Sequence, residues 1–411
     1  MTSDRHIVIV GGGHAGGRVA QHLRALDFDG RLTMVGEEAH PPYERPALSK
    51  ELLVGERPPE DLVLGPNSFW TDSASVRWIR ERASRLDASQ RMLTLADGST
   101  IAFDELVVAT GGRARTLAIP GADLPGVHSL RTIADSLALR DALKPGSRVT
   151  IIGAGVIGME VAASAVRMQA EVIVLEAGRQ ILARCLPSVA SDWLRDIHVS
   201  RGTRIETQVG VTAIAQSGSG LRVHAVRDSG EAFSLDTDIV LVAVGIESAV
   251  EFLDGSGIAT AGGIPVGEDC RSPVAPWCLA AGDVSITYNS LYDTALRQET
   301  WRNAESQARA VAEFLMGRTE PFLEIPWMWT DQFEHNIQVV GRPDGADEVI
   351  TSHDKAGRIA TILSLRGGRI VAGVLINNGR DRRYLEKLIR SGVTVERHRL
   401  ADVSISLKEL C

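Results

Sequence analysis

Two short glycine patterns stand where the chain could hold a dinucleotide. In the first, residues 6 to 16, HIVIVGGGHAG, run from apolar residues into Gly11, Gly13 and Gly16. In a turn between a strand and a helix, such glycines permit a tight turn, let the backbone approach a pyrophosphate, and allow helix and strand to pack closely. The helix N-terminus then faces the phosphate charge. Glu37 ends the next apolar run, where a carboxylate can accept hydrogen bonds from ribose hydroxyls.

The same pattern recurs in residues 148 to 158, RVTIIGAGVIG, with Gly153, Gly155 and Gly158, and the strand AEVIVLE that follows ends at Glu176. A single GxGxxG pattern is weak support, because glycine loops often serve only as turns. Two complete units of strand, glycine turn, helix, strand and acid make a chance match improbable. The sequence therefore predicts two dinucleotide-binding sites.

The elements around these loops predict an α/β fold. A hairpin that turns at Asp97 and Gly98 is followed by a buried strand, and a similar apolar run, TDIVLVAVG, follows the second unit and ends at Gly245. A later apolar run, WCLAAGDVS, ends where ligands bind in open α/β sheets. Small or polar residues stand at these strand ends: Ala109, Thr110, Gly111, Gly245, Gly282 and Asp283.

The composition bounds the possible functions. The 411 residues carry 44 Lys plus Arg against 52 Asp plus Glu, and the net charge of -8 argues against nucleic-acid binding. The four cysteines form no CxxC pair and no histidine stands at metal-ligand spacing from them, so we expect free thiols and no metal. The chain shows no leader and no apolar run of about 18 residues, which predicts a cytoplasmic protein without a membrane partner.

Several longer motifs are more specific than the glycine patterns. In chain order they are YERPALSK at 43 to 50, ATGGRAR at 109 to 115, IIGAGVIGMEVAA at 151 to 163, AAGDV at 280 to 284, RQETWRNAESQA at 297 to 308 and PWMWTDQ at 326 to 332.

By these motifs the chain resembles the two-dinucleotide-domain flavoprotein reductases, and within them the NADH-dependent ferredoxin reductases of bacterial oxygenase systems. The resemblance implies FAD in the first unit and NADH in the second. We therefore expect two Rossmann-like domains plus a C-terminal α+β domain. The implied FAD domain is discontinuous, at residues 1–115 and 246–322, with the NADH domain inserted at 116–245 and the C-terminal domain at 323–411.

The resemblance also assigns residues to the FAD site. Arg45 is expected beside the pyrophosphate and Lys50 beside the isoalloxazine, although a solvated surface lysine is the plain alternative. Asp283 would bond the ribityl chain, and the helix that starts at Trp301 would stabilise negative charge at the flavin edge. Further positions matched to the family are Ala83 near the adenine and two arginines, Arg115 and Arg131.

The expectations about hydride and electron transfer rest on Lys50, Glu160 and Trp329. The resemblance implies that Glu160 reaches toward Lys50 and contacts the nicotinamide carboxamide. The plain alternative is a glutamate in the first turn of a helix, where the helix dipole stabilises its negative charge. Trp329 matches a tryptophan near the flavin edge, and a structural tryptophan at a domain interface is an equal alternative. A catalytic role is also conceivable for His14, inside the first glycine loop, but we interpret this residue as loop filler.

Glu176 bears on the choice of nicotinamide nucleotide. Its carboxylate would accept hydrogen bonds from the ribose hydroxyls and repel a 2′-phosphate, which favours NADH over NADPH. Arg179 and Arg184 lie close in sequence and could meet a phosphate, or they could be ordinary loop charge.

The segment HPPYERPALSK, residues 40 to 50, lacks the cysteine pair that several flavin-dependent disulfide reductases carry there, so electrons must leave the protein. By resemblance the acceptor is a [2Fe–2S] ferredoxin. We expect it to dock on basic residues drawn from two segments, which elsewhere are often solvated helix faces. They are Arg297, Arg302 and Arg309, then Arg380, Arg382, Arg383, Lys387 and Arg390.

Two other functions stay open at this point. A reductase of the same fold could act on monodehydroascorbate, a quinone, rubredoxin or oxygen. A flavoprotein similar to apoptosis-inducing factor would act largely by binding, but it would be expected to carry a targeting leader and a basic DNA-binding surface.

Overall fold

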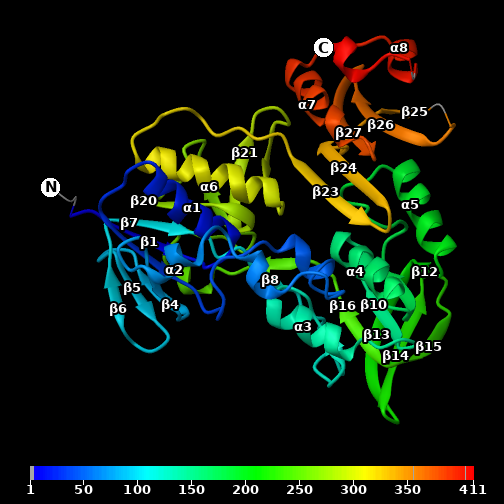
Figure 1. The fold of residues 1–411 in the computed structure, drawn as a ribbon, viewed down its shortest axis with the longest axis horizontal. Coiled ribbons are helices and arrows are strands. Elements are labelled where there is room, and N and C mark those ends of the chain that lie inside the picture. The colour runs from blue at the N-terminus through cyan, green and yellow to red at the C-terminus, as the bar shows by residue number, and fades with distance from the viewer. Residues whose placement is uncertain (1–3, 355, 403) are drawn as a thin grey trace. The chain divides into compact units, whose positions relative to one another are not determined.

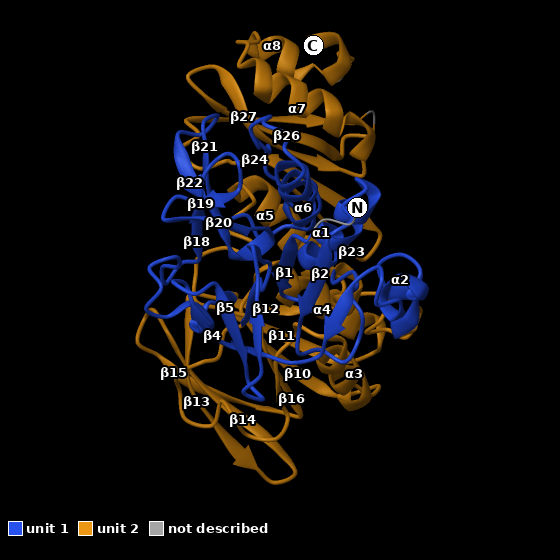
Figure 2. Ribbon diagram, turned by 90° about the vertical axis from the view of Figure 1, so that its left-hand side faces the viewer, with its two compact units in different colours: residues 1–45, 59–113, 246–326 blue, residues 46–58, 114–245, 327–411 orange. Residues whose placement is uncertain are grey.

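Three separate stretches of chain build each of the two units into which the protein divides (Figure 2). The computed structural model describes residues 4–354, 356–402 and 404–411. Unit 1 contains residues 1–45, 59–113 and 246–326, and unit 2 contains residues 46–58, 114–245 and 327–411. The short segment 46–58, which includes Lys50, therefore groups with unit 2.

Unit 1 is built on a six-stranded sheet in the order β19-β20-β7-β1-β2-β3. Only β19 and β20 are antiparallel neighbours. The first strand is buried on both faces: Ile7 and Ile9 belong to one hydrophobic cluster, and Val8 and Val10 to another. The strands are β1 (His6–Val10), β2 (Arg31–Val35), β3 (Arg77–Ile79), β7 (Glu105–Val108), β19 (Arg271–Ser272) and β20 (Ala275–Ala280).

The cluster of Ile7 and Ile9 includes residues of two helices, α1 (His14–Ala25) and α6 (Trp301–Leu315). These helices pack side by side although they lie far apart in sequence, blue and yellow in Figure 1. The cluster of Val8 and Val10 includes residues of a small antiparallel sheet, β4 (Ala83–Asp87), β5 (Met92–Leu95) and β6 (Thr100–Ala102). The sheet is therefore covered on both faces, as its apolar strands require.

The remaining elements of unit 1 are short. They are the sheet of β18 (Ile264–Val266), β21 (Ser285–Asn289) and β22 (Thr294–Leu296), the strand β17 (Ile246–Ser248), the helix α2 (Asn67–Thr71), and three 3-10 helices, η2 (Pro59–Leu62), η3 (Glu251–Leu253) and η4 (Gly282–Val284). Strand β8 (Gly112–Ala114) spans the change from unit 1 to unit 2 along the chain.

Unit 2 contains a second parallel sheet, in the order β12-β11-β10-β16-β9. In the central strand, every residue from Val149 to Ile152 is buried, so its sequence is continuously apolar or small. The strands are β9 (Val127–His128), β10 (Arg148–Ile152), β11 (Glu171–Glu176), β12 (Arg204–Thr207) and β16 (Ile239–Val242), and the helices are α3 (Ile133–Ala142), α4 (Val156–Arg167) and α5 (Ser188–Ser200).

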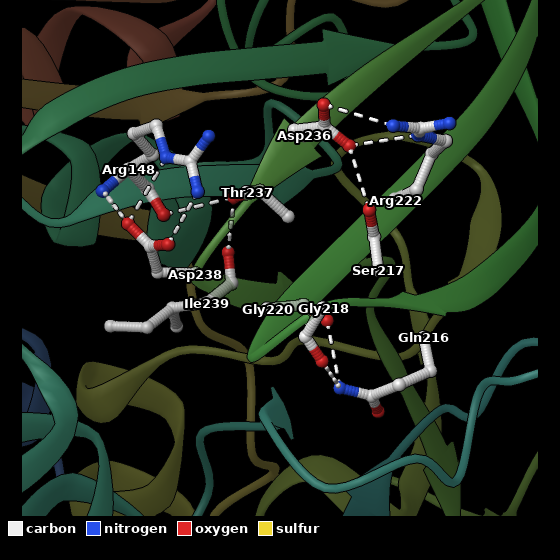
Figure 3. A network of polar contacts seen from close by, with 10 residues as sticks. All are labelled: Arg148, Gln216, Ser217, Gly218, Gly220, Arg222, Asp236, Thr237, Asp238 and Ile239. Carbon is white, nitrogen blue, oxygen red and sulfur yellow. Dashed lines mark hydrogen bonds and ion pairs between the residues drawn. The ribbon is translucent and has the colours of Figure 1, made fainter.

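A three-stranded antiparallel meander leads back into this sheet: β13 (Val209–Ser217), β14 (Gly220–Arg227) and β15 (Ala232–Thr237). Polar contacts hold the end of this meander against the parallel sheet (Figure 3). The Thr237 hydroxyl donates to the carbonyls of Arg148 and Ile239, and the Arg148 guanidinium pairs with Asp238 at 2.6 Å. The start of β10 is thus tied to the turn between β15 and β16.

The C-terminal part of unit 2 forms an antiparallel sheet in the order β23-β24-β27-β26-β25. Its strands are β23 (Trp327–Gln332), β24 (His335–Gly341), β25 (Glu348–His353), β26 (Ile359–Arg366) and β27 (Arg369–Ile376). The helices that follow are η5 (Gly379–Asp381), α7 (Arg382–Ser391), α8 (Arg397–Ala401) and η6 (Leu407–Leu410), and η1 (Pro46–Ser49) also belongs to unit 2.

The predicted fold class is confirmed, since both glycine turns join a parallel strand to a helix and a mixed C-terminal part follows. The hairpin predicted at Asp97 and Gly98 forms between β5 and β6. Sequence reasoning had not anticipated the meander or β25. Among the helices of the described residues, none has both the length and the apolar character needed to cross a membrane.

Candidate active site

The first glycine loop, between β1 and α1, has no room for a Cβ atom at Gly11 or Gly16. Gly11 has φ +121°, and a Cβ there would lie 2.2 Å from the Ala109 carbonyl oxygen. A Cβ on Gly16 would lie 2.0 Å from the carbonyl oxygen of Gly11. Gly13 caps α1, and a Cβ on it would lie 3.4 Å from Nη2 of Arg45. The predicted roles of the three glycines as turn, approach and packing positions fit this geometry.

Unit 1 carries buried polar atoms that fit a bound FAD. Nδ1 of His14, Nε1 of Trp78 and Oε1 of Gln298 are buried and have no hydrogen-bond partner among the described residues. Trp78 lies beside the first loop, since a Cβ on Gly12 would be 3.9 Å from its Nε1. Such groups destabilise a protein unless a ligand or water satisfies them. The predicted ribose ligand Glu37 is exposed beyond β2.

Arg45 is held in place by its own neighbours. Its guanidinium pairs with the Glu38 carboxylate at 2.6 Å and lies 5.0 Å from the ring centroid of Tyr43, whose hydroxyl also donates to Glu38. A cation is therefore fixed beside Gly13, at the N-terminus of α1, where a pyrophosphate would be attracted.

The other FAD positions predicted in unit 1 lie at the ends of its strands and at the start of α6. The Thr110 hydroxyl donates to the Ala249 carbonyl at 2.7 Å, and the amide of Gly282 donates to Oε1 of Gln307 at 2.9 Å. Trp301 is the first residue of α6, behind the Thr300 N-cap. Of the remainder, Ala83 begins β4, Ala109 and Gly111 follow β7, and Asp283 lies in η4.

His14 is more than loop filler, because it joins the first loop to α6. It is 8% exposed, its Nε2 lies 2.7 Å from Oε1 of Glu305, and its ring lies 5.5 Å from that of Trp301. Arg18 pairs with the same carboxylate at 2.5 Å. The sequence interpretation of His14 is wrong, since nothing in the spacing showed that α6 would pack on α1.

The second glycine loop, between β10 and α4, repeats the first. Gly153 has φ +104°, and a Cβ on it would lie 2.5 Å from the Ala243 carbonyl oxygen. A Cβ on Gly158 would lie 2.1 Å from the carbonyl oxygen of Gly153. At Gly155, the N-cap of α4, no atom of the described residues outside its own helix and chain neighbours lies within 4 Å of an added Cβ. This open space in front of a helix N-terminus suits a phosphate group.

Glu176 is the last residue of β11, and its side chain contacts the second glycine loop. Its carboxylate accepts hydrogen bonds from the backbone amides of Ala154 and Gly178, both at 2.7 Å. Gly245 has φ +101° and accepts a hydrogen bond from the amide of Arg115. Of the remaining predicted residues in unit 2, Arg115, Arg179 and Arg184 are exposed, and Arg131 lies just before α3.

An ion pair forms one turn into α4. Nζ of Lys50 lies 3.6 Å from Oε1 of Glu160 and 3.5 Å from Oδ2 of Asp331, and it also lies 5.7 Å from the ring centroid of Trp329. The side chains of Lys50 and Glu160 are only 12% and 6% exposed. The structure thus brings together the three residues predicted for hydride and electron transfer.

Two hydroxyl groups hold the Glu160 carboxylate. Ser49 donates a hydrogen bond to Oε2, and Thr330 donates one of 2.7 Å to Oε1. Burial raises the pKa of the Glu160 carboxyl, and Asp331 adds to the rise, whereas Lys50 and the two hydroxyl groups act in the opposite direction. Sequence reasoning missed Ser49 and Thr330, although both lie inside the motifs that carry Lys50 and Trp329.

Comparison with known proteins decides the family. Residues 5–308 match the pyridine nucleotide-disulphide oxidoreductase family, and residues 327–411 match a family described as reductase C-terminal. The chain is a pyridine nucleotide-disulphide oxidoreductase. Its cofactors are FAD and a nicotinamide nucleotide, in keeping with the two glycine loops.

Within the pyridine nucleotide-disulphide oxidoreductases, similar curated proteins are reductases of oxygenase systems. The chain is 36% identical over 410 residues to the benzene 1,2-dioxygenase system ferredoxin–NAD(+) reductase subunit of Pseudomonas putida, covering 98% of this chain and 97% of the relative. It is 35% identical to the biphenyl dioxygenase system ferredoxin–NAD(+) reductase component of Paraburkholderia xenovorans, covering 98% of each.

Solved structures of ferredoxin and putidaredoxin reductases resemble this chain along almost its whole length. The ferredoxin reductase for the CYP199A2 system of Rhodopseudomonas palustris matches with a TM-score of 0.91 and 34% identity, covering 98% of this chain and 99% of that one. The covalent putidaredoxin reductase–putidaredoxin complex matches with a TM-score of 0.92 and 29% identity, covering 99% and 98%.

This pyridine nucleotide-disulphide oxidoreductase has no disulphide to reduce within itself. Its four cysteines are all free, and burial raises the pKa values of Cys185, Cys270 and Cys278 to about 12. A thiol with so high a pKa is a poor nucleophile at neutral pH. Among the described residues there is also no cluster of side chains that could hold a metal ion.

Two tryptophans on β23 stack beside Lys50. The rings of Trp327 and Trp329 lie 5.4 Å apart at an angle of 22°, and Nε1 of Trp329 donates to Asp331 at 3.1 Å. The guanidinium of Arg382, the first residue of α7, lies 4.6 Å from the ring centroid of Trp327. The stack therefore has a cation at each end.

The predicted basic residues differ in how far they are neutralised. Glutamates pair with Arg297, Arg302, Arg309 and Arg382. In contrast, Arg380, Arg383, Lys387 and Arg390 are exposed on or beside α7. Similar proteins are named as ferredoxin reductases, and one of the similar solved structures is a complex of a reductase with putidaredoxin.

Proposed function

We propose that this chain takes a hydride from NADH and passes single electrons to a [2Fe–2S] ferredoxin that supplies an oxygenase. The observation that carries the proposal is the buried Lys50–Glu160 pair, placed one turn into the helix that begins at the second glycine loop. The lack of a cysteine pair in residues 40 to 50 supports an external acceptor.

In this reaction, the chain's own residues would bind and orient the two cofactors and stabilise the charge that develops on the flavin. The first glycine loop and Arg45 would hold the FAD pyrophosphate, and the N-terminus of α6 would stabilise negative charge at the flavin edge. FAD, when bound, accepts two electrons as a hydride and can return them one at a time. Lys50 would favour the electron-rich flavin, and Glu160 would accept a hydrogen bond from the nicotinamide carboxamide.

The preference for NADH is part of this proposal. Glu176 already accepts two backbone hydrogen bonds, so its carboxylate is fixed at the end of β11 where a ribose would lie. A fixed negative charge at that place repels the 2′-phosphate of NADPH. The names of the similar NAD(+) reductases agree with this preference.

We also propose the three-domain division predicted from the sequence, with a discontinuous FAD domain at 1–115 and 246–322, an NADH domain at 116–245 and a C-terminal domain at 323–411. The boundary before the last domain is supported by the match of residues 327–411 to a separate family. A cytoplasmic location belongs to the same proposal, and the four free thiols are consistent with a reducing compartment.

The test is NADH-dependent reduction of cytochrome c by the purified protein, with and without a [2Fe–2S] ferredoxin, repeated with NADPH. We expect a rate that depends on ferredoxin and is much larger with NADH. Rapid flavin reduction without ferredoxin-dependent turnover would contradict the proposal that ferredoxin is the acceptor. The proposed NADH site would still hold, and a quinone, oxygen or another carrier would then be the favoured acceptor. Bound FAD without NADH oxidation would favour a binding protein.

The ferredoxin is proposed to dock on the exposed cations of α7. Charge reversal by Arg383→Glu should slow ferredoxin reduction several-fold at low salt and leave flavin reduction by NADH unchanged. Arg358→Glu is the matched control, since Arg358 is also an exposed arginine of unit 2 but lies just before β26. Equal effects of the two reversals would refute docking at α7.

A further inference from the structure

A line of buried hydrogen bonds leads from Glu160 to a histidine on α5. Oγ1 of Thr330 lies 2.7 Å from Oε1 of Glu160, and Nε2 of Gln332 lies 3.0 Å from Oγ1 of Thr330. Oε1 of Gln332 lies 2.7 Å from Nε2 of His198, and Nδ1 of His198 lies 3.4 Å from the hydroxyl of Thr203. Thr330, Gln332 and His198 are all 0% exposed, so water does not compete for these bonds.

Hydrogen-bond chemistry gives the line one direction. An ionised Glu160 can only accept, so the Thr330 hydroxyl must donate to it. The Thr330 oxygen then accepts from the amide nitrogen of Gln332, which leaves the amide oxygen of Gln332 facing His198. His198 must therefore carry its proton on Nε2, and Nδ1 is left to accept from Thr203. Every donor points toward the carboxylate.

We propose that His198 is a positioning residue for Glu160. By donating from Nε2, His198 fixes the orientation of the Gln332 amide, and that orientation obliges Thr330 to donate to Glu160. The carboxylate is thereby kept ionised opposite Lys50, as an acceptor for the nicotinamide carboxamide. This role rests on the proposed function, because it concerns how the nucleotide of that reaction is bound.

The residues around Glu160 and around His198, the two ends of the hydrogen-bonded line, are consistent with this role. Glu160 is faced by Ser49 and Lys50 from the segment of η1 and by Thr330 and Asp331 from β23. Without the hydroxyl donors, burial and Asp331 would disfavour its charge.

His198 is faced by Thr203, by Gln332 and by the ring of Phe333 at 4.9 Å. Arg201 pairs with Glu334, and the Arg201 guanidinium lies 5.6 Å from the ring centroid of Phe333. Burial lowers the pKa of His198 to about 4, partly opposed by the Gln332 hydrogen bond, so the ring is neutral at neutral pH. A neutral ring has one N–H only, as the direction of the line requires.

Loss of His198 would free the Gln332 amide to turn. Its oxygen could then accept from the Thr330 hydroxyl, and Glu160 would lose a donor. A buried histidine that serves only packing would have no such effect on Glu160. The test must therefore measure ionisation of the site and not stability alone.

The experiment follows flavin reduction by NADH in the FAD-loaded protein by anaerobic stopped flow between pH 5 and 9. In His198→Leu, we expect the pH below which NADH binding weakens to rise by about one unit, which corresponds to a tenfold change in the acid dissociation constant of Glu160. His198→Gln, which can still donate to Gln332, should restore the wild-type profile. Thr330→Val should move the profile in the same direction as His198→Leu, and Thr330→Ser should not.

A matched control separates this effect from the loss of any buried histidine. His6 is 7% exposed, its Nε2 lies 2.9 Å from Oγ1 of Thr33, and both residues belong to unit 1. His6→Leu should lower stability without moving the pH profile. Equal profiles for His198→Leu and the wild type, or equal shifts for His198→Leu and His6→Leu, would overturn the proposal.

A second measurement needs neither a leucine variant nor turnover. In histidine-labelled protein, ¹⁵N NMR should show one ring, absent from His198→Gln, that is protonated on Nε2 and does not titrate between pH 5.5 and 9. A proton on Nδ1 would overturn the proposal even if His198→Leu failed to fold. If the wild-type flavin were not reduced by NADH, the proposed function would fail instead, and the NMR result would stand separately.

Discussion

Nζ of Lys50 lies 3.6 Å from Oε1 of Glu160, although 110 positions separate the two residues in the sequence. Lys50 follows a 3-10 turn, Glu160 projects from α4, and β23 supplies Asp331 and Thr330 to the same place. The charges are nearly removed from water, so removal of either partner leaves the other buried and unpaired or less well paired.

Glu160→Gln should weaken NADH binding by about 10- to 100-fold, because a hydrogen bond to a charged group contributes about 1.5–3 kcal/mol. The substitution keeps the volume of the side chain and removes its charge, so FAD content should stay unchanged. The measurement is the NADH concentration dependence of flavin reduction. Glu56→Gln, on an exposed glutamate of unit 2 that pairs with Arg167, should have no effect. Unchanged NADH affinity in Glu160→Gln would exclude a nucleotide contact.

Alanine substitutions at Gly155 and Gly158 should have opposite consequences. Gly158→Ala would place a Cβ 2.1 Å from a backbone oxygen, so we expect a loss of about 1–3 kcal/mol in the free energy of unfolding. In Gly155→Ala, the new methyl group would meet no atom of another part of the described chain within 4 Å, so the melting temperature of this variant should stay close to that of the wild type. Its methyl group would instead occupy the phosphate approach and weaken NADH binding by roughly tenfold. Melting curves and NADH titrations would show whether the two effects separate.

Glu176→Ala should narrow the preference for NADH over NADPH. The substitution removes a ribose acceptor and the charge that repels a 2′-phosphate, and it leaves the amides of Ala154 and Gly178 without their acceptor. We expect kcat/KM for NADH to fall about tenfold and the ratio of the two nucleotides to fall further. Glu171→Ala, at the exposed start of the same strand, is the control. An unchanged ratio would place the selectivity elsewhere.

His198 should make the protein sensitive to acid. Its folded pKa of about 4 lies below its ordinary value of 6.5, so the unfolded chain binds a proton first as the pH falls. The stability from the neutral buried ring is fully present above pH 6.5 and is lost toward pH 4. The shift corresponds to roughly 3 kcal/mol in the free energy of unfolding.

Denaturant unfolding of the wild type and His198→Gln at pH 7.5 and pH 5 would measure this loss. We expect the variant to lose less stability between the two pH values than the wild type. Parallel losses would show that His198 is not the group that titrates.

The sequence predicted much of this architecture because glycine turns are local features. A tight turn is needed at Gly11 and Gly153 because a strand directly precedes a helix at each place. A few neighbouring residues are enough to recognise this pattern. Packing roles for Gly16 and Gly158 could be predicted for the same reason. The meander β13–β15 was missed because its strands contribute no chemical motif.

The candidate site was predicted only in part. Lys50, Glu160 and Trp329 could be named because each lies inside a distinctive motif. Ser49, Thr330 and Gln332 lie inside the same motifs, and His198 lies outside them. None of the four was named, because the role of a serine, threonine, glutamine or histidine side chain depends on its hydrogen-bond partner, and the sequence does not show that partner. His14 was misjudged for the same reason, since Glu305 lies 291 positions away.

The sequence by itself determined that the chain has two dinucleotide loops, an acid after each, and no cysteine pair beside the first. These properties depend on residue type and short spacing, which the chain carries whether folded or not. Only the tertiary structure decided which side chains hold the Glu160 carboxylate and in which direction their hydrogen bonds run. That choice depends on contacts between α4, α5 and β23, and such contacts exist only once the chain has folded and excluded water from between them.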